Sequence, residues 1–346
     1  MIKPKRLKAG DTVAVISPSW GGPGTYPSVY EMGVATLRER FGLIVKELSH
    51  TRASGDFLHA NPQARAADVN AAFADTEVKA VIASIGGEDS IRILPYLDDD
   101  VIRANPKILM GFSDTTTLTT YINRLGLVTF NGPSVMTEFT IMRHLEAAFE
   151  QHVRDILFTP SDRYEYKPFE EWVYAFQPWK TPGYDGTPEK RANTLGWRWV
   201  QGEGRATGRL FGGCIEVLEF MNGTRFWPEP DFWNDRILFL ETSEDKPTPN
   251  QVRYIVRNYG MQGIFDRISA IVFARPFRYD DDEREKLWRE VVGVVAGEFG
   301  RPTLPILGNV EFGHDSPKLI LPLGCLAEID CNAKRFALIE SPVDLT

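Results

Sequence analysis

Short apolar runs alternate with stretches of helical periodicity from residue 12 to about residue 157. Between Tyr30 and Phe41, apolar side chains recur at the spacing of one face of an amphipathic helix. Strands are expected in the β-branched runs 12–17, 43–48, 79–84, 107–112 and 127–130. Because strands that alternate with helices form βα units, the pattern predicts an α/β domain with a doubly wound, mainly parallel sheet.

The periodicity is lost between Phe158 and Gly204, where Trp, Tyr, Phe, Pro and Gly are frequent. A long stretch without regular structure is usually a lid, a binding loop or a linker, and the aromatic content argues against disorder. Farther on, we expect strands at 206–210, 236–240, 269–274, 318–321, 326–329 and 335–339, and helices near 214–221, 248–259 and 281–299. The chain is therefore predicted to consist of an N-terminal α/β domain (1–157), an aromatic-rich substrate loop or linker (158–204) and a mixed, β-rich C-terminal domain (205–346).

Charge and cysteine content narrow the classes of function. Among 346 residues, 39 are Lys or Arg and 47 are Asp or Glu, so the net charge of −8 argues against a nucleic-acid-binding protein. Three cysteines without a CxxC pair cannot form a disulfide framework, which fits a reducing cytoplasm. The apolar run 291–297 is far shorter than the ~20 residues that cross a bilayer, so membrane insertion is not expected.

A strand, a serine and a helix meet at Gly111-Phe112-Ser113-Asp114. Such a junction exposes a serine hydroxyl at the carboxyl edge of a sheet, where the N–H groups of the following helix can stabilise an oxyanion. Thr115 stands where the G-x-S-x-G nucleophile motif has its last glycine. A serine that only caps the helix would account for the same pattern.

A serine nucleophile needs a base and a group that orients the base. Among the five histidines, His314 lies in a loop flanked by glycine and proline, and Glu241 ends a strongly apolar strand. The paired glycines Gly86 and Gly87 follow another strand and are candidate oxyanion donors. A histidine without a role, a salt bridge at a strand end and a plain tight turn are the structural alternatives.

Motifs spread over most of the chain resemble those of the serine LD-carboxypeptidase family, which also contains the microcin C self-immunity peptidases. The resemblance rests on the run 8–19, Arg65-Ala-Ala-Asp68-Val, Gly86-Gly87, Gly111-Phe112-Ser113-Asp114, Gly212-Gly213, Asn222-Gly-Thr224, Glu241 and Gly313-His314, in this order. It implies an N-terminal Rossmann-like or flavodoxin-like domain and a smaller, β-rich C-terminal domain.

The resemblance also implies residue roles. Ser113 would be the nucleophile, His314 the general base and then acid, and Glu241 the group that orients His314. Backbone amides near Gly87 and Asp114 would form the oxyanion hole. No metal or organic cofactor is expected. The protein is expected to form a homodimer. The interval between Ser113 and Glu241 is long because it contains segment 158–204. The short carboxypeptidases lack so large an insertion there, so in this respect the chain is more similar to the self-immunity branch.

In that branch the substrate joins an aminoacyl or peptidyl group to a nucleotide, so an aromatic side chain of the long segment would stack on the purine. Trp179 is the best candidate, and Phe169 and Trp172 are weaker ones. These rings would equally serve to attach the segment to the domain surface.

Two departures from the family pattern bear on the substrate. Cys214 stands where many members have Asn, although a packing role fits it as well. The oxyanion turn reads Gly-Gly-Glu-Asp rather than Gly-Gly-Tyr-Gly, which adds Gly86 and Glu88 to the substrate-binding candidates. We expect a serine hydrolase that cleaves an amide bond near a free carboxylate of a small peptide or peptidyl-nucleotide. The alternatives are trimming of murein tetrapeptides and a non-catalytic ligand-binding module.

Overall fold

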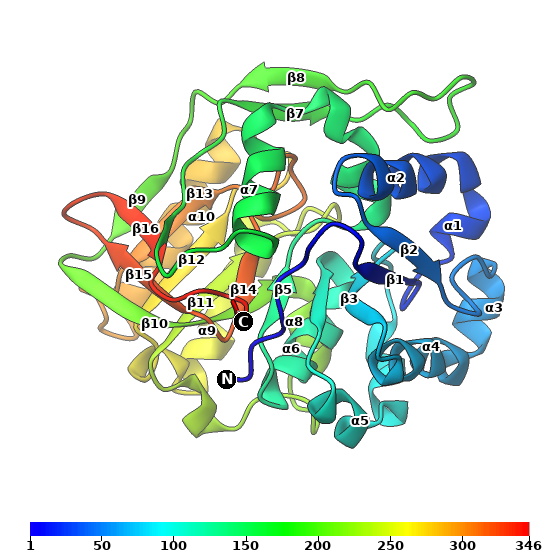
Figure 1. Cartoon of the computed structure of the whole chain (residues 1–346). Helices are drawn as coiled ribbons and strands as arrows, with labels where there is room; N and C mark the ends of the chain where they lie inside the picture. The colour runs from blue at the N-terminus through cyan, green and yellow to red at the C-terminus, as the bar shows by residue number, and fades with distance from the viewer. Residues whose placement is uncertain (346) are drawn as a thin grey trace.

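The computed structural model describes residues 1–345, and most of its strands lie in two sheets that pack side by side (Figure 1). The first sheet has the strand order β14-β5-β4-β3-β1-β2. Its strands are β1 (Thr12–Ile16), β2 (Ile44–Glu47), β3 (Val78–Ala83), β4 (Ile108–Gly111), β5 (Thr129–Asn131) and β14 (Leu321–Leu323). Strands β1 to β5 are parallel in the flavodoxin-like order 2-1-3-4-5, and β14 joins them antiparallel. The predicted fold class is confirmed.

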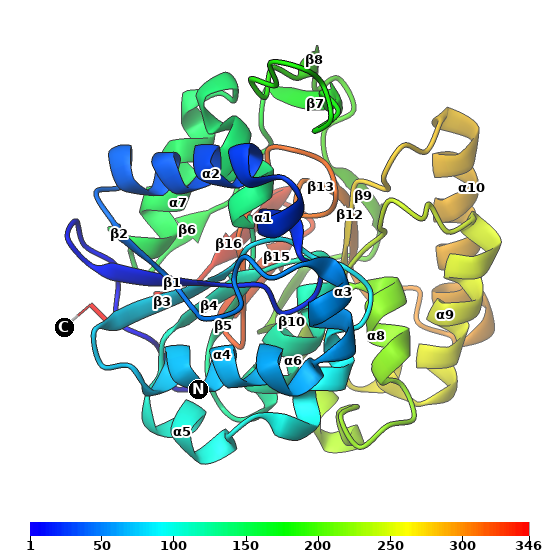
Figure 2. The same ribbon diagram turned by 90° about the vertical axis from the view of Figure 1, so that its right-hand side faces the viewer.

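Helices cover both faces of this sheet because successive side chains of each strand point to opposite faces. Helices α2 and α7 lie on one face of the sheet, and α4, α5 and α6 lie on the other (Figure 2). On β1, Val13 and Val15 belong to the core cluster that contains residues of α2 and α7, whereas Ala14 and Ile16 belong to the cluster that contains residues of α4, α5 and α6. The helices of this half are α1 (Gly22–Thr25), α2 (Pro27–Glu39), α3 (Gly55–Ala60), α4 (Pro62–Ala74), α5 (Asp99–Ala104), α6 (Thr116–Arg124) and α7 (Ala147–Leu157).

The second sheet has the order β6-β16-β15-β10-β11-β12-β13-β9. It comprises β6 (Tyr164–Glu165), β9 (Arg198–Gln201), β10 (Arg205–Cys214), β11 (Arg236–Glu241), β12 (Ala270–Ala274), β13 (Ile306–Val310), β15 (Leu326–Asp330) and β16 (Arg335–Leu338). Strands β10 to β13 are parallel, and their immediate neighbours β15 and β9 are antiparallel to them. The helices of this half are α8 (Ile215–Met221), α9 (Pro249–Met261) and α10 (Asp281–Val292).

Two sequence expectations for this half were wrong. Strand β13 was not predicted, because Gly308 and Asn309 interrupt its apolar run and have the composition of a turn. The strand expected at 318–321 begins only at Leu321, because the Leu319 N–H bonds to the Glu311 carbonyl and the Ile320 N–H bonds to His152 Nε2 instead of to a neighbouring strand.

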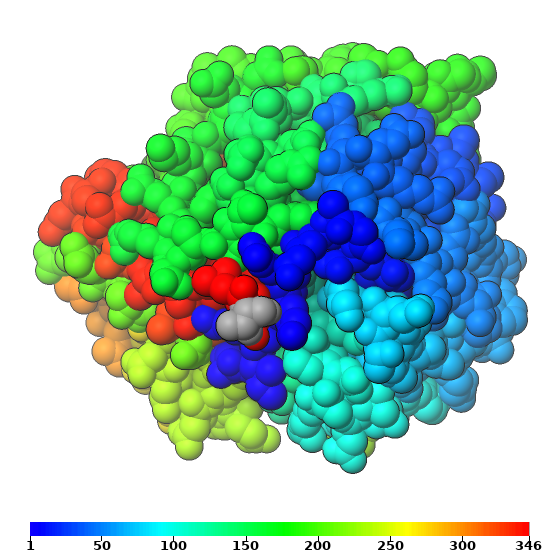
Figure 3. All heavy atoms as spheres, in the orientation of Figure 1, coloured from blue at the N-terminus to red at the C-terminus, as the bar shows by residue number. Residues whose placement is uncertain are grey.

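Segment 158–204 has regular structure, contrary to the sequence expectation. In addition to β6 and β9 it forms a hairpin of β7 (Glu171–Ala175) and β8 (Glu189–Ala192), and it lies across one end of the molecule (Figures 1 and 3). Strand β8 is exposed along its whole length, so it lacks the apolar alternation that predicts a strand. The division of the chain at residues 157 and 204 stays a prediction.

The two sheets approach each other closely where β10 meets α6. The backbone N–H of Cys214 donates a hydrogen bond of 3.1 Å to the Thr116 hydroxyl. A Cβ atom on Gly213 would lie 2.5 Å from the Thr116 side chain, so only glycine fits there. Within residues 1–345, no helix combines the length and the apolar character needed to cross a membrane.

Replacing Gly213 with Ala is expected to lower the free energy of unfolding by about 1–3 kcal/mol, because the added methyl group overpacks the contact with Thr116. Gly297→Ala is the matched control, since a Cβ atom there meets no atom within 4 Å. Urea denaturation of both variants measures the difference. Equal stability of the two variants would contradict the close approach of β10 and α6.

Candidate active site

Ser113 is separated from β4 by Phe112 alone and opens a short 3-10 turn that leads into α6. Its φ angle of 58° lies in the left-handed region, which is strained for a residue with a side chain. Gly86 leaves the hydroxyl accessible, because a Cβ atom there would lie 3.0 Å from Ser113 Oγ. The strained turn therefore presents the Ser113 hydroxyl at the carboxyl edge of the first sheet, as in a nucleophile elbow.

The structure brings His314 and Glu241 to Ser113. His314 Nε2 lies 3.1 Å from Ser113 Oγ, and His314 Nδ1 lies 2.7 Å from Glu241 Oε2. Glu241 ends β11 and is buried, whereas His314 stands in the loop between β13 and β14. Gly313 permits this approach, because a Cβ atom there would lie 3.1 Å from the Cβ of Glu241. His314 is therefore not an isolated loop histidine, and the ion-pair partner of Glu241 at the strand end is His314 itself.

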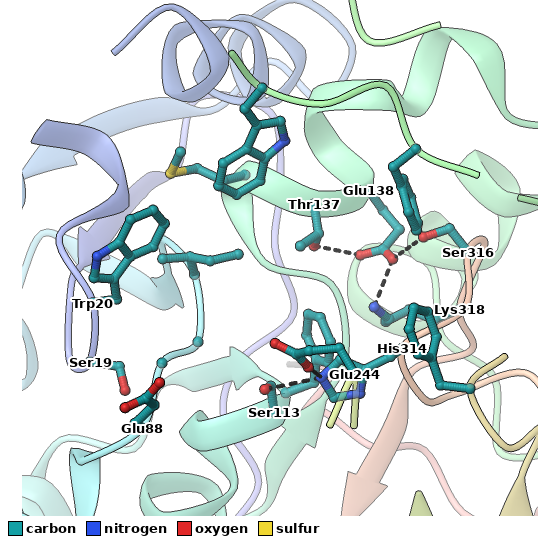
Figure 4. A pocket seen from close by; sticks show the side chains of 18 of the residues that line it. Ser19, Trp20, Glu88, Ser113, Thr137, Glu138, Glu244, His314, Ser316 and Lys318 are labelled. Atoms are coloured by element: carbon teal, nitrogen blue, oxygen red, sulfur yellow. Dashed lines mark hydrogen bonds and ion pairs between the residues drawn. The ribbon is translucent and has the colours of Figure 1, made fainter. Parts of the chain in front are cut away.

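A cavity of about 750 Å³ opens in front of Ser113 and His314 (Figure 4). Its walls include the loops after β1, β3 and β4, at the carboxyl ends of parallel strands. Strands β2 and β3 lie on opposite sides of β1, so the cavity is at the topological switch point of the sheet. Ligands of open α/β sheets bind at this position.

Of the two predicted oxyanion donors, Gly87 lines the cavity, and Asp114 is the residue after Ser113, which also lines it. Neither the N–H of Gly87 nor that of Asp114 donates a hydrogen bond within the part of the chain that the structure describes. The Asp114 carboxylate accepts hydrogen bonds from the Ser90 N–H, at 2.8 Å, and from the Ser19 hydroxyl. Burial raises the pKa of Asp114. This side chain therefore links the turn at Gly87 to the serine junction, a role that the sequence did not indicate.

Two carboxylates act on His314. Burial opposes a charge on the imidazole, but Glu241 and Glu244 outweigh it and raise the pKa of His314 to about 10. Glu244 Oε2 lies 2.9 Å from Nε2, the same nitrogen that faces Ser113. The hydrogen bond from His314 lowers the pKa of Glu244 to about 2. Glu244 was missed because an exposed acidic loop residue carries no motif.

A buried ion pair forms part of the cavity wall. Lys318 Nζ lies 2.7 Å from Glu138 Oε1, and neither side chain is more than 1% exposed. The Ser316 hydroxyl donates to the same carboxylate oxygen, and Lys318 Nζ stands 3.3 Å from the centroid of the Phe112 ring. The pair fixes the chain just after His314. Lys318 and Glu138 are 180 positions apart and belong to no local pattern, so they could not be predicted as a pair.

The substrate-binding candidates divide into two groups. Gly86, Glu88 and Trp179 line the cavity, with the Trp179 ring nearly parallel to that of Trp20 at a centroid distance of 6.3 Å. The structure does not bring the other three candidates to the cavity. Phe169 is buried against Phe149, Trp172 lies beneath the Arg275 guanidinium, and Cys214 is buried at the start of α8.

Models of two domains match the chain: an LD-carboxypeptidase N-terminal domain over residues 13–132 and an LD-carboxypeptidase C-terminal domain over residues 207–329. The chain belongs to the LD-carboxypeptidase family. The resemblance predicted from the motifs is thereby confirmed, and the chain is a hydrolase of the carboxypeptidase type.

Curated relatives of this LD-carboxypeptidase family member span nearly its whole length. The Microcin C7 self-immunity protein MccF of Escherichia coli is 28% identical over 342 residues, 96% of this chain and 94% of its own. A Bacillus subtilis protein named "Probable murein peptide carboxypeptidase" is 30% identical over 348 residues, 99% of this chain and 95% of its own.

Solved structures of LD-carboxypeptidase relatives have the same fold. MccF in complex with aspartyl sulfamoyl adenosine matches 99% of this chain and 100% of its own, with a TM-score of 0.87 and 27% identity. An MccF-like protein from Streptococcus pneumoniae in complex with AMP matches 95% of this chain and 98% of its own, with a TM-score of 0.83 and 26% identity.

Replacing Glu241 with Gln is expected to lower the pKa of His314 below about 10, because one of the two negative charges that stabilise the imidazolium is removed. An NMR titration of the histidine ring nitrogens measures the change. The exposed His59 serves as an internal reference that should not shift. An unchanged His314 titration in a folded Glu241→Gln variant would contradict the contact between the two side chains.

Proposed function

We propose that the protein is a serine amidohydrolase in which Ser113, His314 and Glu241 form the catalytic triad. The observation that carries the proposal is the chain of hydrogen bonds from Ser113 Oγ through the His314 ring to Glu241 at the wall of the cavity. A nucleophile, a base and a buried orienting carboxylate in this order are the parts that acyl transfer requires.

The reaction would proceed through an acyl-enzyme. Ser113 Oγ attacks the carbonyl carbon of the amide while His314 Nε2 accepts its proton. The N–H groups of Gly87 and Asp114 stabilise the resulting oxyanion. His314 then donates the proton to the departing nitrogen, and the carbon–nitrogen bond breaks. A water molecule attacks the ester, gives its proton to His314, and the acid product leaves as Ser113 recovers its proton.

The proposed substrate is a small aminoacyl- or peptidyl-nucleotide compound in which the scissile amide lies near a free carboxylate. Support comes from MccF, whose solved structures hold glutamyl sulfamoyl guanosine and aspartyl sulfamoyl adenosine. Trp20 and Trp179 add flat aromatic surface to the same cavity that Ser113 faces. Such surface suits stacking against a purine base.

Trimming of murein tetrapeptides is the second candidate. It is favoured by the identity of 30% with the Bacillus subtilis protein whose name assigns it to murein peptides. Both candidate reactions would use the same triad to cleave an amide next to an anionic group. The two substrates differ in the part that would lie beside Trp179, which is a nucleotide in one and a peptide in the other.

We also propose a cytoplasmic location and a homodimer. The location is supported by the free, buried state of all three cysteines, Cys214, Cys325 and Cys331, which suits a reducing compartment. The dimer stays a prediction, and sedimentation velocity would test it.

Ser113→Ala and His314→Ala are each expected to reduce kcat by several orders of magnitude, with the double variant hardly slower, because triad members act as a unit. A fluorophosphonate probe should label the native protein and not Ser113→Ala. Hydrolysis is measured on an aminoacyl sulfamoyl adenosine and on a murein tetrapeptide in parallel.

Ser90→Ala is the matched control for the loss of a serine hydroxyl. Its hydroxyl bonds to the Asp114 carbonyl rather than to His314, so labelling should persist. Near-native turnover in either triad variant would refute the assignment.

Trp179→Ala is expected to raise KM for the nucleotide substrate, since stacking contributes about 1–3 kcal/mol per base in nucleic-acid sites. Hydrolysis of a murein tetrapeptide, which lacks a base, should change far less. Trp172→Ala is the control, because this ring lies in the same segment outside the cavity. Equal losses on both substrates in Trp179→Ala would show that the ring serves folding or closure, and murein trimming would then be the better assignment.

A further inference from the structure

Two oxygen atoms compete for one nitrogen of His314. Nε2 lies 3.1 Å from Ser113 Oγ and 2.9 Å from Glu244 Oε2 (Figure 4). Nδ1 lies 2.7 Å from Glu241 Oε2. The contact with Glu244 is no part of a Ser–His–Glu triad, in which Nε2 faces only the nucleophile. This extra carboxylate needs a separate explanation.

The two contacts require different protonation states of Nε2. An ionised carboxylate only accepts hydrogen bonds, so Glu244 can bind Nε2 only when that nitrogen carries a proton. Ser113 can be activated only when Nε2 is free of a proton and can accept the one on Oγ. With Nδ1 donating to Glu241, the form bound to Glu244 is the imidazolium ion, and it cannot act as a base.

The other charged groups near His314 face partners of opposite charge. Lys318 is paired with Glu138. Asp315, the next residue in the loop, faces Arg275 at 3.8 Å, and Arg275 also pairs with Glu311 at 3.0 Å. The rings that pack edge-on against the imidazole, Phe112 and Phe277, carry no charge. Beyond Glu241, the charge that faces His314 without a cationic partner of its own is therefore that of Glu244.

Glu244 is also free to move. It lies in the loop between β11 and α9, its side chain is 66% exposed, and the Glu241 side chain is fully buried. Its neighbour Lys246 is engaged with Glu283 at 2.8 Å, and no other side-chain donor within residues 1–345 holds the Glu244 carboxylate. Leaving His314 would thus cost Glu244 one ion pair and return its carboxylate to water.

A substrate in the cavity needs the place that Glu244 occupies. Glu244 lines the cavity beside Ser113 and His314. The nitrogen of the scissile amide must come within hydrogen-bonding reach of Nε2 to receive its proton. An anionic group near the scissile amide, as in both candidate substrates, would repel the Glu244 carboxylate at such short range.

We propose that Glu244 is a displaceable positioning residue: in the empty cavity it holds His314 protonated and Ser113 unactivated, and it leaves when a substrate occupies the cavity. This inference rests on the proposed function, because it assigns His314 as the base. It predicts a resting enzyme whose serine has low reactivity toward water and small electrophiles. Substrate binding then supplies the neutral imidazole that the attack requires.

The first test needs no substrate. The rate of Ser113 labelling by a fluorophosphonate probe is measured against pH for the native protein, Glu244→Gln and the control Asp245→Asn, whose exposed carboxylate is outside the cavity. Loss of an opposite charge in contact shifts a pKa by roughly 1–3 pH units, so Glu244→Gln should label roughly 10- to 1,000-fold faster at pH 7. Asp245→Asn should match the native protein.

If the labelling rate falls on the acid side at the same pH in Glu244→Gln as in the native protein, the inference is overturned. If the native protein and Glu244→Gln both fail to label, the proposed function fails instead. An NMR titration of the histidine ring nitrogens still decides the role of Glu244 in that case, since a lower pKa of His314 in Glu244→Gln shows that Glu244 stabilises the imidazolium without any reaction at Ser113.

The second test asks whether Glu244 leaves during turnover. The acid limb of kcat/KM reports His314 in the free enzyme, and that of kcat reports it in the substrate complex. In the native protein the limb of kcat should lie at lower pH than that of kcat/KM. Glu244→Gln should move the limb of kcat/KM and leave that of kcat nearly in place. Equal shifts of both limbs would show that Glu244 stays on His314 throughout and would refute displacement.

Discussion

The hydrogen bond between Ser113 and His314 crosses the boundary between two sheets, and the rest of the site depends on it. Ser113 follows a strand of the first sheet, whereas Glu241 ends a strand of the second. The hydrogen bond forms only if the two sheets stay at a fixed distance from each other. Glycines permit the close contacts that set this distance. Gly213 lets β10 approach α6, and Gly313 lets the His314 loop approach Glu241.

Much of the fold was predictable because parallel strands buried on both faces are short, continuous apolar runs. Strands β1, β3 and β4, and helix α2, lie close to the expected positions. The predictions failed where tertiary pairing overrides local preference. Strand β13 contains Gly308 and Asn309 yet is held between β12 and β9, and β8 has no apolar face because it pairs with β7 at the surface.

The site was predictable to the extent that its residues end strong strands. Ser113 and Glu241 both follow apolar runs, so the topology itself brings them to sheet edges. Glu244 and the pair of Lys318 and Glu138 were not predictable, since a charge in a loop is usually solvated and its partner is far away in sequence. Aromatic content identified segment 158–204 as important, but it could not distinguish Trp179, in the cavity wall, from Trp172, outside it.

Strand β14 limits how the molecule can move. The chain leaves the second sheet at Val310, carries His314 past Ser113, and enters the first sheet at Leu321. The segment that carries His314 is therefore anchored at both ends, one on each sheet. Any hinge motion between the sheets would pull His314 away from Ser113 and break the hydrogen bond between them. Access for a ligand depends instead on the surface segments that line the cavity, among them the stretch around Trp179 and the loop of Glu244.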